Sequence, residues 1–176
     1  EASAWAGPFA DALLRAAERQ EQRPADAGVR ELLRTLELPL SSVLADLELR
    51  GVMVDTSVLG HLGDIMAKEL AGLEERAREA SGHRDLNVGS PRQLETILFD
   101  ELGLEATKRT KTGRTTDAEA LEAIADDHPL PRLVLEHRAI AKLKGTYVDA
   151  LPKLIHPTTG RIHGHWRQAV AATGRI

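Results

Sequence analysis

Two long segments with apolar residues at helical spacing constrain the fold of this 176-residue chain most strongly. In 128–151, apolar side chains recur every three or four residues, the pattern of a helix with one buried face. The segment 55–81 has the same pattern, with Asp55 as a candidate N-cap and Gly82 at its end. About 26 residues would make a helix of roughly 39 Å. We expect the two helices to pack together, and the longer one to bury Val58, Leu59, Leu62, Ile65, Met66, Leu70, Leu73, Ala77 and Ala80.

Shorter helices are predicted between the two long ones. Ser90 and Pro91 form a strong helix start, with the serine at the N-cap and the proline in the first turn. A second capping box is predicted over 116–119, with Thr116 as its cap. After Pro152 the chain has a turn cluster and then a partly alternating segment, Ile162–Trp166. The expected fold is therefore mostly α, with a short β segment at the C-terminus.

Composition excludes some classes of protein. Aromatic residues are only 3% of the chain, so the core must be built mainly from Leu, Ala, Val and Ile. The absence of cysteine excludes a disulfide scaffold and a thiolate metal site. No apolar run approaches the roughly 20 residues that span a bilayer, and no signal-peptide pattern opens the chain. We expect a cytoplasmic protein without a membrane segment.

The charges are distributed unevenly along the chain. Residues 130–176 hold eight Lys and Arg against two Asp and Glu, a net charge of +6, so the other residues carry −10 of the total of −4. The loop 108–116, which we call the basic loop, has four cations, four threonines, one glycine and no acid. Cations, hydroxyl groups and backbone N–H groups all bind phosphate oxygens. The basic loop is therefore a candidate phosphate-binding element, although a solvated turn explains the same residues.

Two further groups of polar residues could follow an anionic backbone. Arg138, Lys142 and Thr146 recur at i, i+4 spacing, which would place them in a row on one face of the second long helix. Asn87 and Ser90 flank a helix N-terminus, whose free N–H groups attract anions. A solvated helix face and ordinary helix capping are the alternative interpretations.

No motif in the sequence indicates a catalytic or metal site. His156, His163 and His165 have no further ligand at convincing spacing, and the chain has no HExxH or phosphate-binding GxxxxGK[ST] motif. No nucleophile, base and acid can be singled out as a group. From its residues alone, the chain shows a binding surface without an active site.

Five blocks in their order and spacing resemble the family A DNA polymerases of bacteria. The blocks are LELPLSSVLADLELRGVMVD (36–55), LNVGSPRQLETILFDELGL (86–104), TKRTKTGRTTDAEALEAI (107–124), LEHRAIAKLKGTYVDALPKLIHPTTGRIH (135–163) and QAVAATGRI (168–176). The resemblance implies that 1–37 end an exonuclease-like domain or form a linker. It implies that 38–151 form the thumb, two long antiparallel helices with a small helical tip, and that 152–176 are the first strands of the palm.

The resemblance also implies a set of residues that contact a primer-template duplex. The basic loop would lie at the thumb tip, and Gln168 and Arg175 would lie near the primer end. The whole set is Asn87, Ser90, Lys108, Arg109, Lys111, Thr112, Arg114, Thr115, Arg138, Lys142, Lys144, Thr146, Gln168 and Arg175. Contacts of this kind with the phosphate backbone fix position without reading sequence.

The chain departs from the family pattern in two respects. Gly145 stands where the KLKSTY block of the family has serine. The catalytic carboxylates, which would hold Mg²⁺, and the deoxynucleotide site would lie beyond Ile176. We therefore expect a truncated monomeric part of a replication and repair polymerase, inactive alone and without a cofactor of its own. The alternatives are a free-standing, non-catalytic helical DNA-binding module and a helical interaction protein.

Overall fold

The computed structural model describes residues 2–20, 28–106, 109–110, 113–168, 170–171, 173 and 175–176. The chain divides into two compact units, of which the first combines residues 1–53 with 156–176 and the second is Val54–Ile155. The fold is mostly α, as the sequence predicts. Over the residues that the structure describes, no helix is long and apolar enough to cross a membrane.

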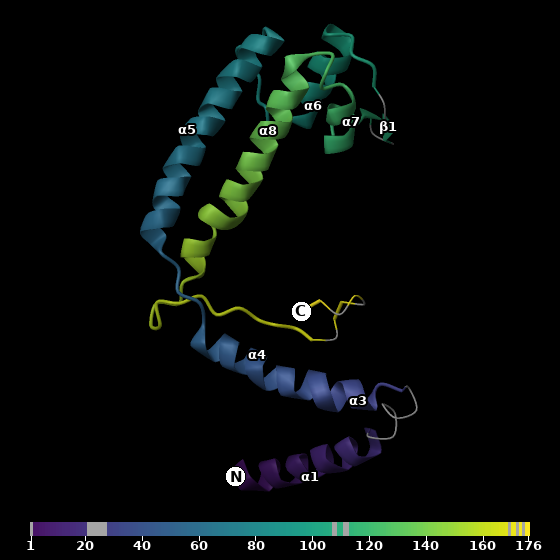
Figure 1. The fold of residues 1–176 in the computed structure, drawn as a ribbon, viewed down its shortest axis with the longest axis vertical. Helices are drawn as coiled ribbons and strands as arrows, with labels where there is room; N and C mark the ends of the chain where they lie inside the picture. Colours follow the sequence, from purple (N-terminus) through teal and green to yellow (C-terminus); the bar gives the residue numbers. More distant parts are fainter. Residues whose placement is uncertain are drawn as a thin grey trace. The chain divides into compact units, whose positions relative to one another are not determined.

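Two antiparallel helices, α5 (Thr56–Ser81) and α8 (Pro129–Leu143), form the body of the second unit (Figure 1). The predicted start of α5 is confirmed, because the Asp55 carboxylate accepts hydrogen bonds from the backbone N–H groups of Ser57 and Val58 at 2.9 and 3.2 Å. Its predicted end is confirmed by Gly82, which adopts φ +74°, a conformation that favours glycine. Local capping chemistry thus sets both ends of the longest helix.

The second long helix is shorter than predicted as a regular α-helix. After Leu143 the chain continues as a π-helical turn, η3 (Lys144–Val148), and then as a 3₁₀ turn, η4 (Leu151–Leu154). A π turn bonds residue i to i+5 and so changes the angular spacing of its side chains. Thr146 therefore does not continue the α-helical row that was expected from Arg138 and Lys142.

Short elements form a tip at one end of the two long helices (Figure 1). They are α6 (Pro91–Glu95), the π turn η2 (Thr96–Glu101), the strands β1 (Arg109–Thr110) and β2 (Gly113–Arg114), and α7 (Ala118–Ala123). Ser90 caps α6 as predicted, accepting from the N–H of Gln93 at 3.4 Å. The predicted cap of α7 was wrong by one residue. Asp117 accepts from Ala120 N–H at 2.9 Å, while the Thr116 hydroxyl accepts a hydrogen bond from Arg138.

The hydrophobic core of the second unit lies where the long helices meet the tip. Leu94, Leu98, Leu121, Leu130 and Val134 are completely buried there. The predicted buried stripe of α5 is correct only in its second half. Leu73 and Ala77 are buried, whereas Val58, Leu62 and Ile65 are 53%, 38% and 46% exposed. The reason is that the tip elements supply apolar partners only to the C-terminal half of α5.

The described residues of the first unit form helices and one pair of bridged extended residues. Its helical elements are α1 (Ala2–Gln20), α3 (Arg30–Leu32), the π turn η1 (Leu33–Glu37) and α4 (Leu38–Arg50). The β segment expected near the C-terminus takes the form of a single antiparallel bridge between Val52 and Ile162. Gly51 precedes the bridge with φ +64°, and a Cβ on it would lie 2.9 Å from the Ile162 carbonyl oxygen. Only glycine fits this close approach without strain.

Candidate nucleic-acid interface

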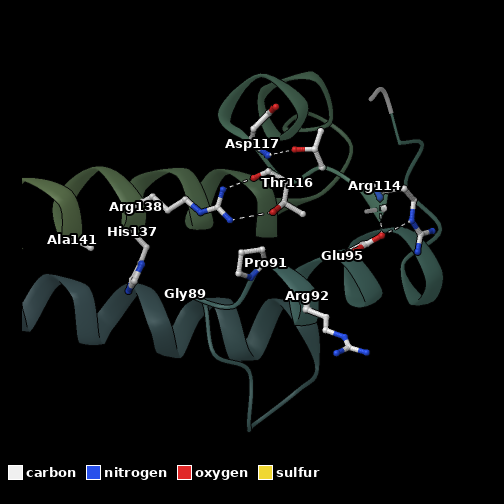
Figure 2. Close-up of a pocket in the computed structure, with 12 residues that line it drawn as sticks. Gly89, Pro91, Arg92, Glu95, Arg114, Thr116, Asp117, His137, Arg138 and Ala141 are labelled. Carbon is white, nitrogen blue, oxygen red and sulfur yellow. Dashed lines mark hydrogen bonds and ion pairs between the residues drawn. The ribbon is translucent and has the colours of Figure 1, made fainter. Parts of the chain in front are cut away.

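An open cleft of about 930 Å³ lies at the tip, between the first turns of α6, the end of the basic loop and one face of α8 (Figure 2). Two predicted DNA-contacting arginines, Arg114 and Arg138, lie in its wall together with the exposed Arg92 and the half-buried His137. The remaining lining residues are Gly89, Pro91, Glu95, Gly113, Thr115, Thr116, Asp117 and Ala141. The structure thus brings residues from three separate sequence blocks to one concave surface.

Arg138 ties α8 to the end of the basic loop. Its Nη1 donates to the Thr116 carbonyl oxygen, and its Nη2 donates to the Thr116 hydroxyl at 3.3 Å (Figure 2). Partial burial lowers the pKa of Arg138, and the Asp117 carboxylate opposes that effect. An arginine stays protonated at neutral pH despite such a shift. Arg138 is therefore a charged clamp that holds Thr116 in place beside the cleft.

Arg114 has more internal partners than a solvated loop cation would have. Its backbone N–H donates to Glu95 Oε1 at 2.8 Å, and its Nη2 donates to Asp100 Oδ2 at 2.6 Å. The guanidinium also lies over the Phe99 ring, 5.3 Å from its centroid. We call Arg114, Glu95, Asp100 and Phe99 the Arg114 cluster. The hydrogen bond between Arg114 and Asp100 lowers the pKa of the aspartate and raises the pKa of the arginine.

The corner before α6 is ordered by hydrogen bonds of its own. The Asn87 side-chain oxygen accepts from Gly89 N–H at 2.9 Å, and Asn87 N–H donates to Gln93 Oε1 at 2.8 Å. Asn87 is exposed and Ser90 is half-buried. The capping interpretation is confirmed for Ser90, and the exposed corner lies next to the cleft, which Gly89 helps to line.

The cations on the second half of α8 and on η3 have different surroundings. Lys142 is exposed, whereas the Lys144 ammonium donates to both carboxylate oxygens of Asp149 at 2.8 Å. Thr146 is exposed on the π turn. Lys142 is therefore the member of this group whose charge is most accessible to a ligand.

The remaining predicted residues fall into three groups. Lys108, Lys111 and Thr112 lie outside the described residues, and of Arg109 only the backbone in β1 is described. Thr115 accepts from Asp117 N–H at 3.1 Å. In the first unit, Gln168 Nε2 donates to the backbone and side chain of Glu37 at 2.9 and 2.8 Å, and Arg175 is exposed. Gln168 and Arg175 therefore belong to the first unit and are not among the residues that line the tip cleft.

Sequence reasoning missed the acids that organise this surface. Glu95 and Asp100 lie 19 and 14 residues before Arg114, and no local pattern marks either as its partner. His137 lies within the predicted helical segment 128–151 but was not singled out there. Its Nε2 lies 3.4 Å from Glu74 Oε1, and its Nδ1 is buried without a hydrogen-bond partner among the described residues. The signal that could have found it is that a histidine, a titratable residue, occupies a position in a helical pattern of apolar residues.

Over the described part of the chain, no group of three or more His, Asp or Glu residues could hold a metal ion. His163, one of the histidines weighed as a ligand, instead contacts the Glu48 carbonyl oxygen at 2.7 Å and the Thr159 hydroxyl at 2.8 Å. The described residues therefore do not fit a two-metal centre of the kind that assists phosphoryl transfer.

The chain thus contains a hairpin of two long helices, and at its tip the basic loop borders a polar cleft. Residues 56–176 match the family model described as DNA polymerase family A. The chain belongs to this family.

Known proteins match most of the chain. DNA polymerase I of Synechocystis sp. is 45% identical over 165 residues, 93% of this chain and 17% of its own length. The thermostable DNA polymerase I of Thermus aquaticus is 48% identical over 147 residues, 82% of this chain and 18% of its own length. A solved structure of the POL domain of Pol1 from M. smegmatis, in complex with DNA primer-template and dNTP, matches with a TM-score of 0.76 and 40% identity. It covers 92% of this chain and 28% of that one. The chain thus spans less than a fifth of the length of these curated relatives.

Proposed function

We propose that this chain is the part of a DNA-directed DNA polymerase that holds the primer-template duplex during template-directed synthesis in replication and repair. The observation that carries the proposal is the basic loop, held beside an open cleft by Arg138 and Arg114, in a member of DNA polymerase family A. The M. smegmatis structure, a complex with DNA primer-template and dNTP, supports a duplex as the ligand. We assign 38–151 to the thumb and 152–176 to the start of the palm.

In this proposal the accessible polar groups contact the sugar-phosphate backbone. Lys142 on α8 and Thr146 on η3 would each contact the backbone, and the Asn87–Ser90 corner would contact it next to the cleft. The basic-loop residues Lys108, Arg109, Lys111, Thr112 and Thr115 would contact the duplex. Arg175 and Gln168 would lie near the primer end. Arg114, Arg138 and Lys144 could reach phosphate only by exchanging the partners described above.

The chemistry of nucleotide addition is assigned to other parts of the polymerase. Magnesium ions and deoxynucleotides would be bound there, by the catalytic carboxylates and nucleotide site that the family resemblance implies for the whole polymerase. We expect no primer extension by the 176-residue chain with Mg²⁺ and all four deoxynucleotides. Elongation of a labelled primer on a gel would show that a catalytic centre is present. We further propose that the chain is a monomer and that it associates with the bacterial nucleoid, where duplex DNA would be available to it.

Salt-dependent binding to a labelled primer-template duplex tests the proposal. Fluorescence anisotropy between 50 and 200 mM KCl should give a strong fall in affinity, because each phosphate contact contributes about 0.9 to the slope of log K against log salt. Replacing Lys108, Arg109 and Lys111 by alanine should reduce that slope by up to about 2.7. The matched control replaces three cations of the first unit, Arg15, Arg19 and Arg50, by alanine. Equal effects of the two triple variants, or an affinity independent of salt, would contradict a phosphate grip by the basic loop.

A further inference from the structure

The Arg114 cluster is unlike a phosphate-binding site, although it lies in the basic loop. Arg114 is 24% exposed and Glu95 26% exposed at their side chains, and Asp100 is 53% exposed. Two carboxylates beside one guanidinium leave a local charge of −1, which repels a phosphate. The guanidinium is further covered by Phe99 on one face. A cation held in this way has little capacity left for DNA.

The cluster instead fixes the backbone of the loop. Glu95 Oε1 accepts from the backbone N–H of Arg114 at 2.8 Å and lies 3.4 Å from its Nε, so one carboxylate oxygen holds both the main chain and the side chain. Gly113 adopts φ +147°, and a Cβ there would lie 2.7 Å from the same oxygen. The carboxylate can approach β2 this closely only because residue 113 is glycine.

Fixing β2 also fixes the strand that precedes it. Arg109 pairs with Arg114, and Thr110 pairs with Gly113, in the two-residue antiparallel ladder. A two-stranded ladder of this length has almost no stability of its own. Its position therefore depends on what anchors it, and the Glu95 and Asp100 carboxylates, from α6 and η2, are the anchors that the structure shows.

We propose that Glu95 and Asp100 are positioning residues for duplex binding, which act through Arg114 to hold β2, and with it the paired strand β1, in a fixed position. The proposal rests on the duplex-holding function proposed above. It assigns a favourable role in DNA binding to two acids whose charge, taken alone, opposes it. It also assigns Arg114 to the loop's anchoring, in place of the direct phosphate contact that the sequence predicted.

The sign of one effect separates this proposal from simple electrostatics. The double variant Glu95→Gln, Asp100→Asn keeps the shape of both side chains and removes two negative charges. If the acids only repel DNA, the duplex should bind more tightly. If they position the loop, the duplex should bind about three- to tenfold more weakly, because phosphate contacts need a fixed geometry. The matched control is Glu122→Gln, Asp127→Asn, which removes the same charge from exposed acids of the same unit.

Two readouts are needed, one without DNA and one with it. Without DNA, amide hydrogen exchange at Arg114 should become at least about tenfold faster in the double variant and stay unchanged in the control. With DNA, anisotropy at 100 mM KCl should show weaker binding for the double variant and equal or tighter binding for the control. The helical circular dichroism and melting temperature of each variant establish that it is folded.

The outcomes distinguish failure of this inference from failure of the proposed function. Unchanged exchange at Arg114, or a double variant that binds the duplex as tightly as the control variant, overturns the positioning role. If the unmodified chain binds no duplex at 50 mM KCl, the duplex-holding function fails, and the exchange measurement still decides whether Glu95 and Asp100 anchor the loop. Restoring the acids one at a time should recover slow exchange more with Glu95, since Glu95 accepts from the backbone itself.

Discussion

Val134 offers the sharpest test of how α8 is held against α5 and the tip. It is completely buried in the core cluster that also contains Leu73, Ala77, Leu130 and Leu133. Val134→Ala removes two buried carbons, which at about 0.8 kcal/mol each amounts to about 1.6 kcal/mol of lost burial. The cavity left behind adds up to about 1 kcal/mol if the helices do not close over it. We expect the free energy of unfolding to fall by about 1.5–2.5 kcal/mol.

Urea unfolding followed by circular dichroism at 222 nm measures this change. With a slope of about 2 kcal/mol per molar urea, the midpoint should fall by about 1 M. Glu136→Ala is the control, because residue 136 is exposed on the same helix. It should change stability by no more than about 0.5 kcal/mol. A loss below that value for Val134→Ala would refute the packing of this face of α8, whereas a change in slope would indicate an altered unfolded state.

Three further predictions concern helix ends and glycines. Gly145 has an ordinary φ and open space around its Cβ position, so Gly145→Ala should raise the free energy of unfolding by about 0.5–1 kcal/mol in the same urea assay. Gly82→Ala should lower it by about 1–2 kcal/mol, because φ +74° is unfavourable for alanine, and an unchanged midpoint would contradict the left-handed cap. Asp55→Ala should lower the melting temperature at neutral pH. The Ser57 hydroxyl and then the N–H groups of Val58 and Ser57 lower the pKa of Asp55 below its ordinary value of about 3.9. Its stabilising charge is therefore complete above about pH 5 and is lost as the pH falls through the folded-state pKa. Melting temperatures of both proteins from pH 7 to pH 3 should converge at the acid end, and a constant difference would refute the charged cap.

The sequence predicted the parts of this fold that local chemistry determines. Asp55, Ser90 and Gly82 act at helix ends through groups two or three residues away, so their patterns can be read directly. The extent of burial on α5 was not predictable in this way, because Val58 and Leu73 look alike in the sequence. Only the placement of the tip decides which of them finds an apolar partner.

The sequence predicted which cations belong to the candidate site, but it did not predict how they are arranged or what they contact. Composition marks the basic loop, but the roles of its members depend on partners far along the chain. Arg114 pairs with acids on α6 and η2, and Arg138 holds Thr116, 22 residues before it. The π turn at Lys144–Val148 was also missed, since nothing in the apolar spacing signals a change from i+4 to i+5 bonding.

The bridge between Val52 and Ile162 has a consequence for the order of folding. These residues exchange two backbone hydrogen bonds, of 2.8 and 2.9 Å. In the sequence they are separated by the whole of the second unit, which is inserted into the first unit. Closing a flexible loop of that length costs conformational entropy. The helices α5 and α8 run antiparallel, and a Cβ on Gly63 would lie 3.4 Å from Val148, so the chain after α8 returns alongside the first half of α5. Folding of the second unit therefore closes most of the loop in advance. Damage to its core should also delay the bridge, whereas loss of the bridge should leave the second unit folding at its normal rate.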